Sequence, residues 1–166
     1  VAGAHKSESG GVVLGLTTEE EVRAAFARLG GRVLLQPQVQ DTGAELLVGV
    51  VQDERFGPIV AAGPGGVLAE LIADANLALA PLSDTDADRM LTHGRLGKLV
   101  AGFRGPALDK PALTDLLLRV SQLAEDFPEI VELDLNPVLA SPEQIVAVDA
   151  RVRVRPASHA PARKTW

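Results

Sequence analysis

Three oxygen-bearing side chains near the end of the sequence have the types and spacing that metal chemistry needs. Asp134 and Asn136 are two residues apart in an apolar segment, so on a β-strand their side chains leave the same face. If Ser141–Gln144 forms a four-residue loop, Asn136 lies opposite Asp149 on the next strand, with Cβ atoms about 5 Å apart. Two carboxylates and an amide are hard oxygen donors, which suit Mg²⁺. We expect a metal site here; the alternative is that strand-end Asp and Asn side chains cap turns.

A glycine-rich loop, with Gly63, Gly65 and Gly66, lies between two apolar segments. Free backbone N–H groups in such a loop can hold a phosphate or another anion. The loop matches neither the P-loop nor the dinucleotide fingerprint, so a plain tight turn is the alternative. Glu45 and Glu70 stand in apolar segments on either side of it. Each carboxylate needs a hydrogen bond or an ion pair if it is buried, and otherwise faces solvent.

His5 stands in a polar loop that ends in Gly10 and Gly11. An imidazole in a loop of this kind can act as an acid, a base or a transient phosphoryl acceptor. The alternative is a solvated loop histidine without a chemical role. The two other histidines lie in a polar turn and in the C-terminal tail, and we assign them no function.

Composition limits the classes of protein to which this chain can belong. Its 166 residues have the length of one domain, and a hydrophobic content of 46% suits a soluble globular fold. A net charge of −6 argues against binding to nucleic acid, which requires clustered cations. The absence of cysteine excludes disulfides, Cys-ligated zinc and thiol catalysis. No apolar run approaches the ~20 residues of a membrane span, and the start lacks a signal peptide. We expect a soluble, cytoplasmic protein with no membrane partner.

Several segments carry the signals of α-helices. Thr18 and Glu21 form a capping box before an apolar face of period 3.6, and Gly30-Gly31 ends that helix. Ser83 opens an N-cap cluster before a second helix. Further helices are predicted at Leu96–Gly102 and, most clearly, from about Lys110 to Asp126.

The remaining apolar segments predict strands, because they are short and bounded by turn residues. With aromatic residues at only 3%, Val, Leu and Ala must fill the core that these elements form. We also expect a strand before Val1 and a flexible tail over residues 156–166. The predicted strands are Val12–Leu16, Val33–Leu35, Glu45–Val51, Phe56–Ala62, Val67–Ile72, and a final hairpin of Ile130–Asn136 with Ile145–Asp149.

Six motifs, in order along nearly the whole chain, resemble the nucleotide-binding subunit or domain of NDP-forming acyl-CoA synthetases. Each motif alone is modest, but six in register are specific. His5–Leu16 is similar to HKSDxGGVxLGL, Asp53–Val60 to DPxFGPVV, Gly63–Leu71 to GLGGVxxEL, Leu79–Asp84 to LAPLTD, Glu132–Pro137 to ELDINP, and Val148–Arg151 to LDAR.

The resemblance implies an α+β ATP-grasp fold that holds ATP or ADP and Mg²⁺ between two lobes. A largely antiparallel sheet with flanking helices is expected, with a first lobe at about residues 1–35, incomplete at its N-terminus, and a second at about 36–155. By family analogy Asp134, Asn136 and Asp149 lie at the metal, and Gln36 to Val39 meet the adenine. Glu45 and Glu70 then lie near the nucleotide, and His5 matches a loop histidine that relays phosphate.

The family reaction converts acyl-CoA, NDP and phosphate into acid, CoA and NTP, through a phosphohistidine. The resemblance therefore implies a CoA-binding and phosphohistidine domain or subunit as partner, and predicts that this segment alone is inactive. Ala78 stands where the family has an arginine. This difference supports an alternative function: a catalytically degenerate, ligand-sensing domain of a protein that carries a GNAT-type lysine acyltransferase.

Overall fold

The computed structural model describes residues 11–39, 43–65 and 74–156. The chain divides into two compact units, the first ending at Gln40 and the second beginning at Asp41. Among the described residues, no helix is both long enough and apolar enough to cross a bilayer.

Helix α1 (Glu19–Leu29) is the regular element of the first unit. The hydroxyl of Thr18 accepts a hydrogen bond from the Glu21 N–H at 3.3 Å, and the Glu21 carboxylate accepts one from the Thr18 N–H at 3.1 Å. This reciprocal pair is the predicted capping box. Gly30 ends the helix with φ at 65°, a backbone conformation that costs glycine little. Both ends of α1 therefore confirm the sequence-based prediction.

Two predicted strands of the first unit do not form. Val12–Leu16 and Val33–Leu35 have no regular secondary structure, and Leu14 and Leu34 are 72% and 81% exposed. A strand needs a neighbour for its N–H and C=O groups, and within the described part of this unit neither segment pairs with one. Their apolar composition is typical of strands, but composition does not supply the partner. The predicted strand Val67–Ile72 lies outside the described residues.

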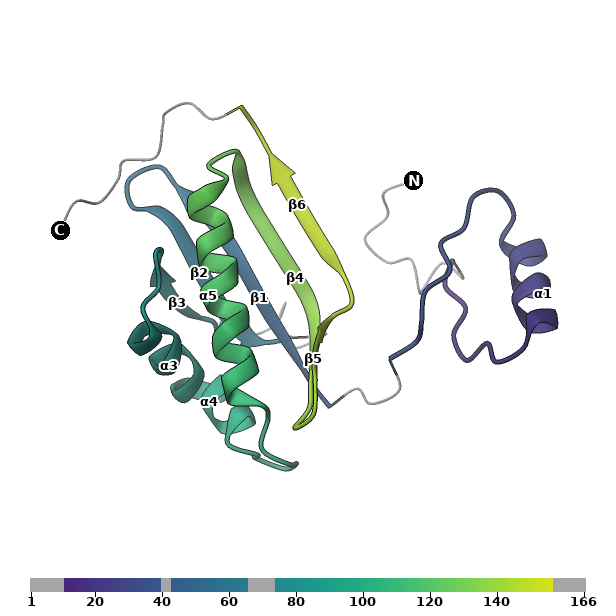
Figure 1. Ribbon diagram of the computed structural model, residues 1–166, viewed down its shortest axis with the longest axis horizontal. Helices are drawn as coiled ribbons and strands as arrows, with labels where there is room; N and C mark the ends of the chain where they lie inside the picture. The colour runs from purple at the N-terminus through teal and green to yellow at the C-terminus, as the bar shows by residue number, and fades with distance from the viewer. Residues whose placement is uncertain (1–10, 40–42, 66–73, 157–166) are drawn as a thin grey trace. The chain divides into compact units, whose positions relative to one another are not determined.

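The second unit is built on an antiparallel sheet in the order β3-β2-β1-β4-β5, in which β6 also pairs with β4 (Figure 1). The first two strands form a hairpin, as predicted, and the third continues from it along the sheet. The last strands return beside β4, so that β4 lies between β1 and the β5–β6 segment. The strands are β1 (Ala44–Asp53), β2 (Gly57–Pro64), β3 (Asn76–Leu79), β4 (Ile130–Ala140), β5 (Ile145–Ala147) and β6 (Ala150–Val154).

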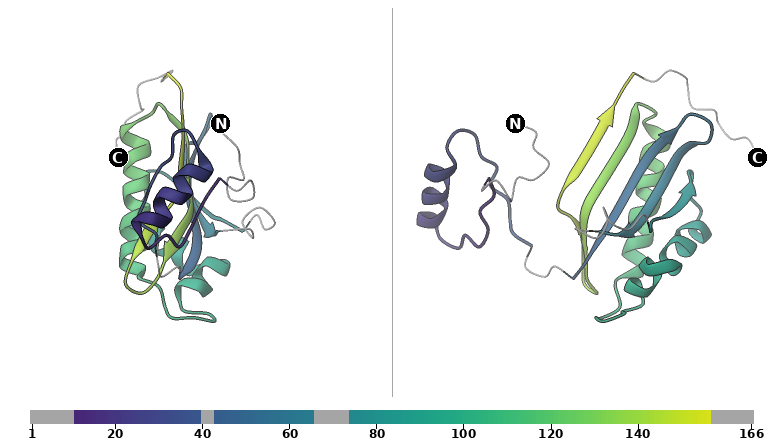
Figure 2. Two further views of the ribbon diagram at one scale, coloured as in Figure 1. Left: turned by 90° about the vertical axis from the view of Figure 1, so that its right-hand side faces the viewer. Right: turned by 180° about the vertical axis from the view of Figure 1, so that it is seen from behind.

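Three helices pack against this sheet: α3 (Asp84–Thr92), α4 (Gly94–Val100) and α5 (Lys110–Asp126). Helix α5 crosses β1 and β2, while α3 packs on α4, α5 and β3. Seen from behind, the strands lie in front of α5, and no helix of the described part of the second unit lies over β1, β4 and β6 on that side, which we call the open face (Figure 2). Helix α5 has the predicted bounds, and α4 begins and ends two residues before the prediction.

Strand alternation divides the side chains of the sheet between its two faces. Leu133, Val50, Val60 and Ala78 are paired in one row across four strands, and the first three are core residues on the helix side. The next row faces the open side; it consists of Asp134, Gly49, Ala61 and Leu77.

The core of the second unit is aliphatic. Valine, leucine, alanine and one methionine make up the buried hydrophobic cluster, as the low aromatic content predicts. All four phenylalanines are instead more than half exposed: Phe26 (51%), Phe56 (64%), Phe103 (57%) and Phe127 (52%). Stability therefore depends on close packing of small aliphatic side chains between α5 and the sheet.

We predict that Leu117→Ala lowers the free energy of unfolding by about 2–5 kcal/mol, because Leu117 is fully buried and its truncation leaves a cavity. Arg119→Ala on the solvent side of the same helix is the matched control, with an expected change of about 0.5 kcal/mol or less. Urea denaturation followed by circular dichroism measures both. Equal losses in the two variants would contradict this account of the core.

Candidate functional site

Polar side chains of β4 form a line on the open face of the sheet. Glu132, Asp134 and Asn136 alternate with apolar residues that face the helices. Glu132 lies opposite Arg153, and Asp134 lies opposite Arg151. Arg153 Nη2 is 2.7 Å from Glu132 Oε2, an ion pair between exposed side chains. Over β4 and β6 the open face thus presents a ladder of acidic and basic groups, whereas over β3 the same face includes Leu77, which is 65% exposed.

The hairpin has the register that a four-residue Ser141–Gln144 loop requires. Val138 pairs with Ala147 on β5, and Leu135 pairs with Ala150 on β6. Between these two pairs, the N–H of Val148 donates to the carbonyl of Pro137 at 3.1 Å. The same register therefore continues across the gap between β5 and β6 and brings Asp149 to the level of Asn136. Whether these residues bind a metal stays a prediction.

The pKa of Asp134 depends on its burial and on the charged side chains beside it. Partial burial raises the pKa of the Asp134 carboxyl above its ordinary value; the Arg151 guanidinium opposes this rise, while Glu132 and Asp149 add to it. The carboxylates of Asp134 and Asp149 are thus close enough to repel each other. Arg151 Nε lies 3.7 Å from Asp149 Oδ2, so a single guanidinium faces both acids. A cation at this point would relieve the repulsion.

The donor set is small by the standards of a protein-only metal centre. Among the described residues, no group of three or more His, Cys, Asp or Glu could hold a metal ion. Asp134 and Asp149 supply two carboxylates, and the third predicted ligand, Asn136, is an amide. Such a set fits Mg²⁺, which usually takes one or two carboxylates and completes its shell with water and substrate phosphates.

Gly49 allows β1 and β4 to approach closely beside Asp134. A Cβ atom at this position would lie 2.7 Å from the carbonyl oxygen of Leu133, so any side chain would push the strands apart. Gly49 has no side chain and the neighbouring Ala61 has only a methyl group, so these two positions leave space above the sheet next to the Asp134 carboxylate. Sequence patterning did not single out Gly49; an isolated glycine inside a strand is the signal that could have found it.

Glu45 lies on the same open face, at the beginning of β1. Buried Leu46 and Val48 face the helices, so Glu45 faces the opposite way and is exposed. Its carbonyl accepts a hydrogen bond from Gly65 N–H at 2.8 Å, which holds the start of the glycine-rich loop against β1. A Cβ on Gly65 would approach Leu46 backbone atoms to 2.6 Å, so this contact requires glycine. Gly63 belongs to β2, opposite Leu47.

The other predicted residues lie elsewhere. Gln36 and Val39 are in the first unit, in an irregular segment that Gln38 ties to Gly15 through a hydrogen bond of 2.6 Å. His5, Gly66 and Glu70 lie outside the described residues. The structure therefore brings together, within the second unit, the acidic hairpin and the start of the glycine-rich loop on one sheet.

Ala78 lies on the face of the sheet opposite to Asp134. It pairs with Val60, whose side chain is fully buried, and it packs against the hydrophobic core. The side chain at this position therefore points toward the helices rather than toward the line of acids on β4. Sequence comparison of the motif could not reveal which face the residue occupies.

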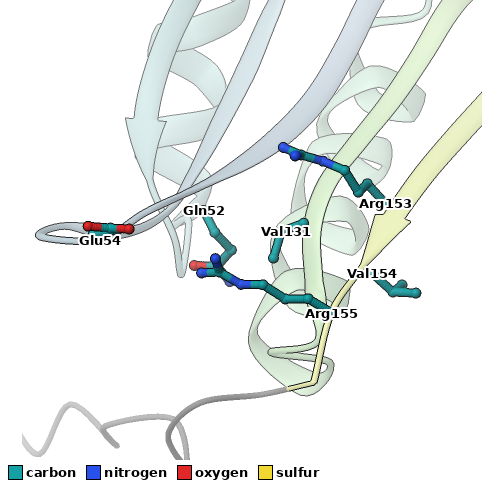
Figure 3. Close-up of a pocket in the computed structure, with 6 residues that line it drawn as sticks. All are labelled: Gln52, Glu54, Val131, Arg153, Val154 and Arg155. Atoms are coloured by element: carbon teal, nitrogen blue, oxygen red, sulfur yellow. The ribbon is translucent and has the colours of Figure 1, made fainter.

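A shallow hollow of about 200 Å³ lies farther along the sheet, toward the β1–β2 turn (Figure 3). In Figure 3 Arg155 extends toward Gln52, while Arg153 lies apart from them. The hollow is lined by Gln52, Glu54, Val131, Arg153, Val154 and Arg155. Arg153 already pairs with Glu132, so the hollow continues the ladder of charges on the open face. It is a separate feature from the Asp134–Asp149 region.

Comparison with known proteins gives concordant matches. A family model described as "ATP-grasp domain" matches residues 2–154. The chain is 40% identical to an acetate–CoA ligase [ADP-forming] II of Archaeoglobus fulgidus over 90% of its own length, but it spans only 23% of that relative. It is 35% identical to the acetate–CoA ligase [ADP-forming] I subunit beta of Pyrococcus furiosus, and there it spans 69% of the relative.

Solved structures agree with these matches. An acetyl-coenzyme A synthetase 1 of Ca. Korarchaeum cryptofilum, in complex with coenzyme A and Mg-AMPPCP, superposes with a TM-score of 0.80 at 39% identity. The match covers 92% of this chain and 71% of that one. Another structure of the same synthetase, with a phosphorylated phosphohistidine segment, has a TM-score of 0.77 at 37% identity and covers 88% and 70%.

We predict that Asp134→Asn raises the free energy of unfolding at pH 7. A carboxyl whose folded-state pKa is raised contributes stability below its unfolded-state pKa and loses it as the pH rises through the folded-state pKa. The variant cannot ionise, so its advantage at pH 7 should shrink toward zero below about pH 4.

Urea denaturation at the two pH values measures this difference. Asp115→Asn, at an exposed position on α5, controls for the general loss of one negative charge. If the wild-type protein were more stable than Asp134→Asn at pH 7, that result would contradict the conclusion that folding raises the pKa of the Asp134 carboxyl.

Proposed function

We propose that this chain, which belongs to the ATP-grasp domains of the NDP-forming acyl-CoA synthetase family, is the nucleotide-binding part of such a synthetase. In this function it binds ADP or ATP together with Mg²⁺. The observation that supports the proposal most is the register of the final hairpin, from which strand alternation predicts Asp134, Asn136 and Asp149 on the same, open face of the sheet. The similar Korarchaeum synthetase binds Mg-AMPPCP, an ATP analogue.

The residues present fit Mg²⁺ by their chemistry. Asp134 and Asp149 provide carboxylates and Asn136 an amide oxygen. Partial burial, with smaller contributions from Glu132 and Asp149, raises the pKa of Asp134, so a bound cation would stabilise its charged form. When bound, Mg²⁺ neutralises charge on the phosphate oxygens of the nucleotide. Arg151 then has two roles in this proposal: it balances Asp149 in the absence of the ion, and it offers a cation to phosphate in its presence.

The nucleotide itself is assigned by the family resemblance. Gly63, Gly65 and Gly66 offer backbone N–H groups to the phosphates, and Glu45 and Glu70 stand close to the nucleotide. The segment from Gln36 to Val39 meets the adenine. The β1 contact of Gly65 supports this assignment, because it anchors the glycine-rich loop at the end of the sheet that Glu45 occupies.

We assign His5 to phosphoryl relay. The reaction consumes acyl-CoA, NDP and phosphate and yields acid, CoA and NTP, with the phosphoryl group passing from acyl phosphate to a histidine and then to NDP. An imidazole nitrogen accepts and releases such a group without further cofactors. A CoA-binding and phosphohistidine domain or subunit must complete the enzyme. The 166-residue chain alone is therefore expected to be inactive, and to bind Mg-ATP no better than in the high micromolar range.

A regulatory domain attached to a GNAT-type lysine acyltransferase is the second candidate, supported by Ala78 in place of the family's arginine. The position of Ala78 on the helix side of the sheet weakens that support, since the substitution leaves the open-face acids unchanged. Turnover separates the two functions: a synthetase forms NTP, whereas a sensor binds nucleotide without forming it.

We predict that Asp149→Asn in the complete enzyme weakens Mg²⁺-dependent ADP binding by about 10–100-fold or more, because loss of even an outer-shell partner costs that much. Calorimetry with ADP in Mg²⁺ and in EDTA gives the metal-dependent part of the affinity. Asp115→Asn, far from the hairpin on α5, is the matched control and should bind as the wild type does. Unchanged Mg²⁺ dependence in Asp149→Asn would remove the hairpin from the metal site.

We further predict that His5→Ala abolishes the acyl-CoA-dependent incorporation of inorganic phosphate into NTP, while Mg-ADP affinity stays within about two-fold of the wild type. The reason is that a relay residue carries the phosphoryl group but does not hold the nucleotide. Isotope exchange measures the first quantity and calorimetry the second. Full turnover by His5→Ala would exclude the relay, and a joint loss of binding would make His5 a nucleotide contact instead.

A further inference from the structure

Strand β4 keeps one continuous register with the last two strands of the sheet. Val138 pairs with Ala147 of β5, and Leu135 pairs with Ala150 of β6. Two residues separate these pairs on each side, so neither side has an extra residue. The three predicted metal ligands therefore belong to one regular piece of backbone, residues 132–153, which we call the acidic hairpin.

The junction between the acidic hairpin and β1 is irregular. Val48 pairs with Leu135, and Leu46 pairs with Val138. Between these pairs β1 has one residue and β4 has two, so β4 forms a β-bulge that includes Asn136. A bulge interrupts the ladder of hydrogen bonds. Packing across the junction must therefore help to set the distance between the two strands.

Gly49 lies at this junction, directly opposite Asp134. A Cβ atom at position 49 would lie 2.7 Å from the carbonyl oxygen of Leu133 and 3.8 Å from the Cα atom of Asp134. The first distance is well below the ~3.5 Å at which non-bonded atoms pack. The obstacle is backbone, which cannot rotate aside as the end of a side chain can. Gly49→Ala would therefore move β4 away from β1 beside Asp134.

The glycine-rich loop is anchored on the other edge of β1. In the sheet, β1 lies between β2 and β4, and β2 leads into the loop. Gly65 N–H donates to the carbonyl of Glu45 at 2.8 Å. A Cβ atom on Gly65 would lie 2.6 Å from backbone atoms of Leu46, so this contact also requires glycine. Strand β1 therefore stands between the acidic hairpin on one edge and the start of the glycine-rich loop on the other.

We propose that Gly49 is a positioning residue: by letting β4 lie close to β1, it sets the distance between the acidic hairpin and the glycine-rich loop. The inference rests on the proposed function, in which the hairpin binds Mg²⁺ and the loop binds the phosphates of the nucleotide. A single Mg²⁺ must then reach oxygens of both, each at about 2.0–2.1 Å in near-octahedral geometry. The two halves of the site therefore need one fixed spacing, on which Gly49 acts through the backbone of Leu133 and Asp134.

The size of the metal ion separates this role from a general effect on stability. Mg²⁺ requires short bonds and near-ideal geometry, whereas Ca²⁺ accepts oxygens at about 2.3–2.6 Å in flexible arrangements. When the hairpin moves away from the loop, Mg²⁺ loses a ligand that Ca²⁺ can keep. A site widened in this way loses affinity for Mg-ADP more than for Ca-ADP, whereas a residue that serves folding alone changes neither affinity in the folded protein.

The test measures ADP affinity by calorimetry in Mg²⁺, in Ca²⁺ and in EDTA, for the complete enzyme with and without Gly49→Ala. Gly57→Ala is the matched control. Gly57 has φ at 81°, so Gly57→Ala strains the backbone, yet apart from its chain neighbours the added Cβ would have no heavy atom within 4 Å. This control therefore costs stability without separating strands. Circular dichroism checks that each variant is folded at the temperature of the titration.

We expect Gly49→Ala to lower the affinity for Mg-ADP by about ten-fold or more, as the loss of a partner of a metal ligand does. The loss of Ca-ADP affinity should be smaller by at least about three-fold, because Ca²⁺ tolerates the longer distances. The affinity for ADP in EDTA should stay within about two-fold of the wild type, since no metal then bridges the two halves. Gly57→Ala should match the wild type under all three conditions.

Three results would overturn the proposal. Equal losses of affinity in Mg²⁺ and in Ca²⁺ would show that position 49 does not control the spacing. A loss of the same size in EDTA would mean that a side chain at this position obstructs the nucleotide itself. Unchanged affinities would leave Gly49 with a role in folding alone.

A second variant decides the question if Gly49→Ala does not fold. Gly65→Ala displaces the glycine-rich loop from the other edge of β1 and should shift the ratio of Mg-ADP to Ca-ADP affinity in the same direction. An unchanged ratio in that variant would overturn the proposal.

The wild-type titrations report on the proposed function separately. A wild-type enzyme with equal ADP affinity in Mg²⁺ and in EDTA would overturn the metal site and this inference with it. If the wild-type affinity depends on the metal and Gly49→Ala keeps the same preference between the two ions, the proposed function stands and only the positioning role of Gly49 is removed.

Discussion

The pairing of β4 with β1 on one side and with β5 and β6 on the other is the constraint on which the rest of the second unit depends. Because side chains alternate along a strand, this pairing sends Leu133 and Leu135 to the helix side and Glu132, Asp134 and Asn136 to the open face. A shift of one residue in register would exchange the two sets. Burial of the aliphatic residues against α5 therefore also determines where the acidic side chains stand.

Balance of charge is the second consequence of that pairing. Arg153 faces Glu132, and Arg151 lies near both Asp134 and Asp149. The side chains of the Arg153–Glu132 and Arg151–Asp149 pairs are exposed, so these pairs contribute little to stability, about 0–1 kcal/mol each. Their importance is local: they hold acids close together on one surface at a point where Gly49 and Ala61 leave room above the sheet. The same arrangement that raises the pKa of Asp134 favours a bound cation.

The two faces of the sheet carry different residues: acidic side chains on the open face and apolar side chains on the helix face. A comparison of motifs does not tell the two faces apart. Ala78 differs from the family pattern, but its side chain packs in the core, on the side away from the acids. On that same helix side, Val152 and Val154 are exposed although they pair with buried or half-buried residues. The proposed nucleotide site thus belongs to the open face, whereas Ala78 belongs to the helix face.

Local signals in the sequence determined the helix ends and the final hairpin, because capping and tight-loop register depend on residues within a few positions of each other. The Thr18–Glu21 capping box, the N-cap Ser83 and the Ser141–Gln144 loop all behave as the sequence predicts. The motifs likewise indicated the family. Strand formation at Val12–Leu16 and Val33–Leu35 was predicted wrongly, since a strand requires a distant partner that no local pattern specifies. For the same reason only the tertiary structure decided that Gly49 lies beside Asp134, that Ala78 faces the core, and that β6 leaves two valines uncovered.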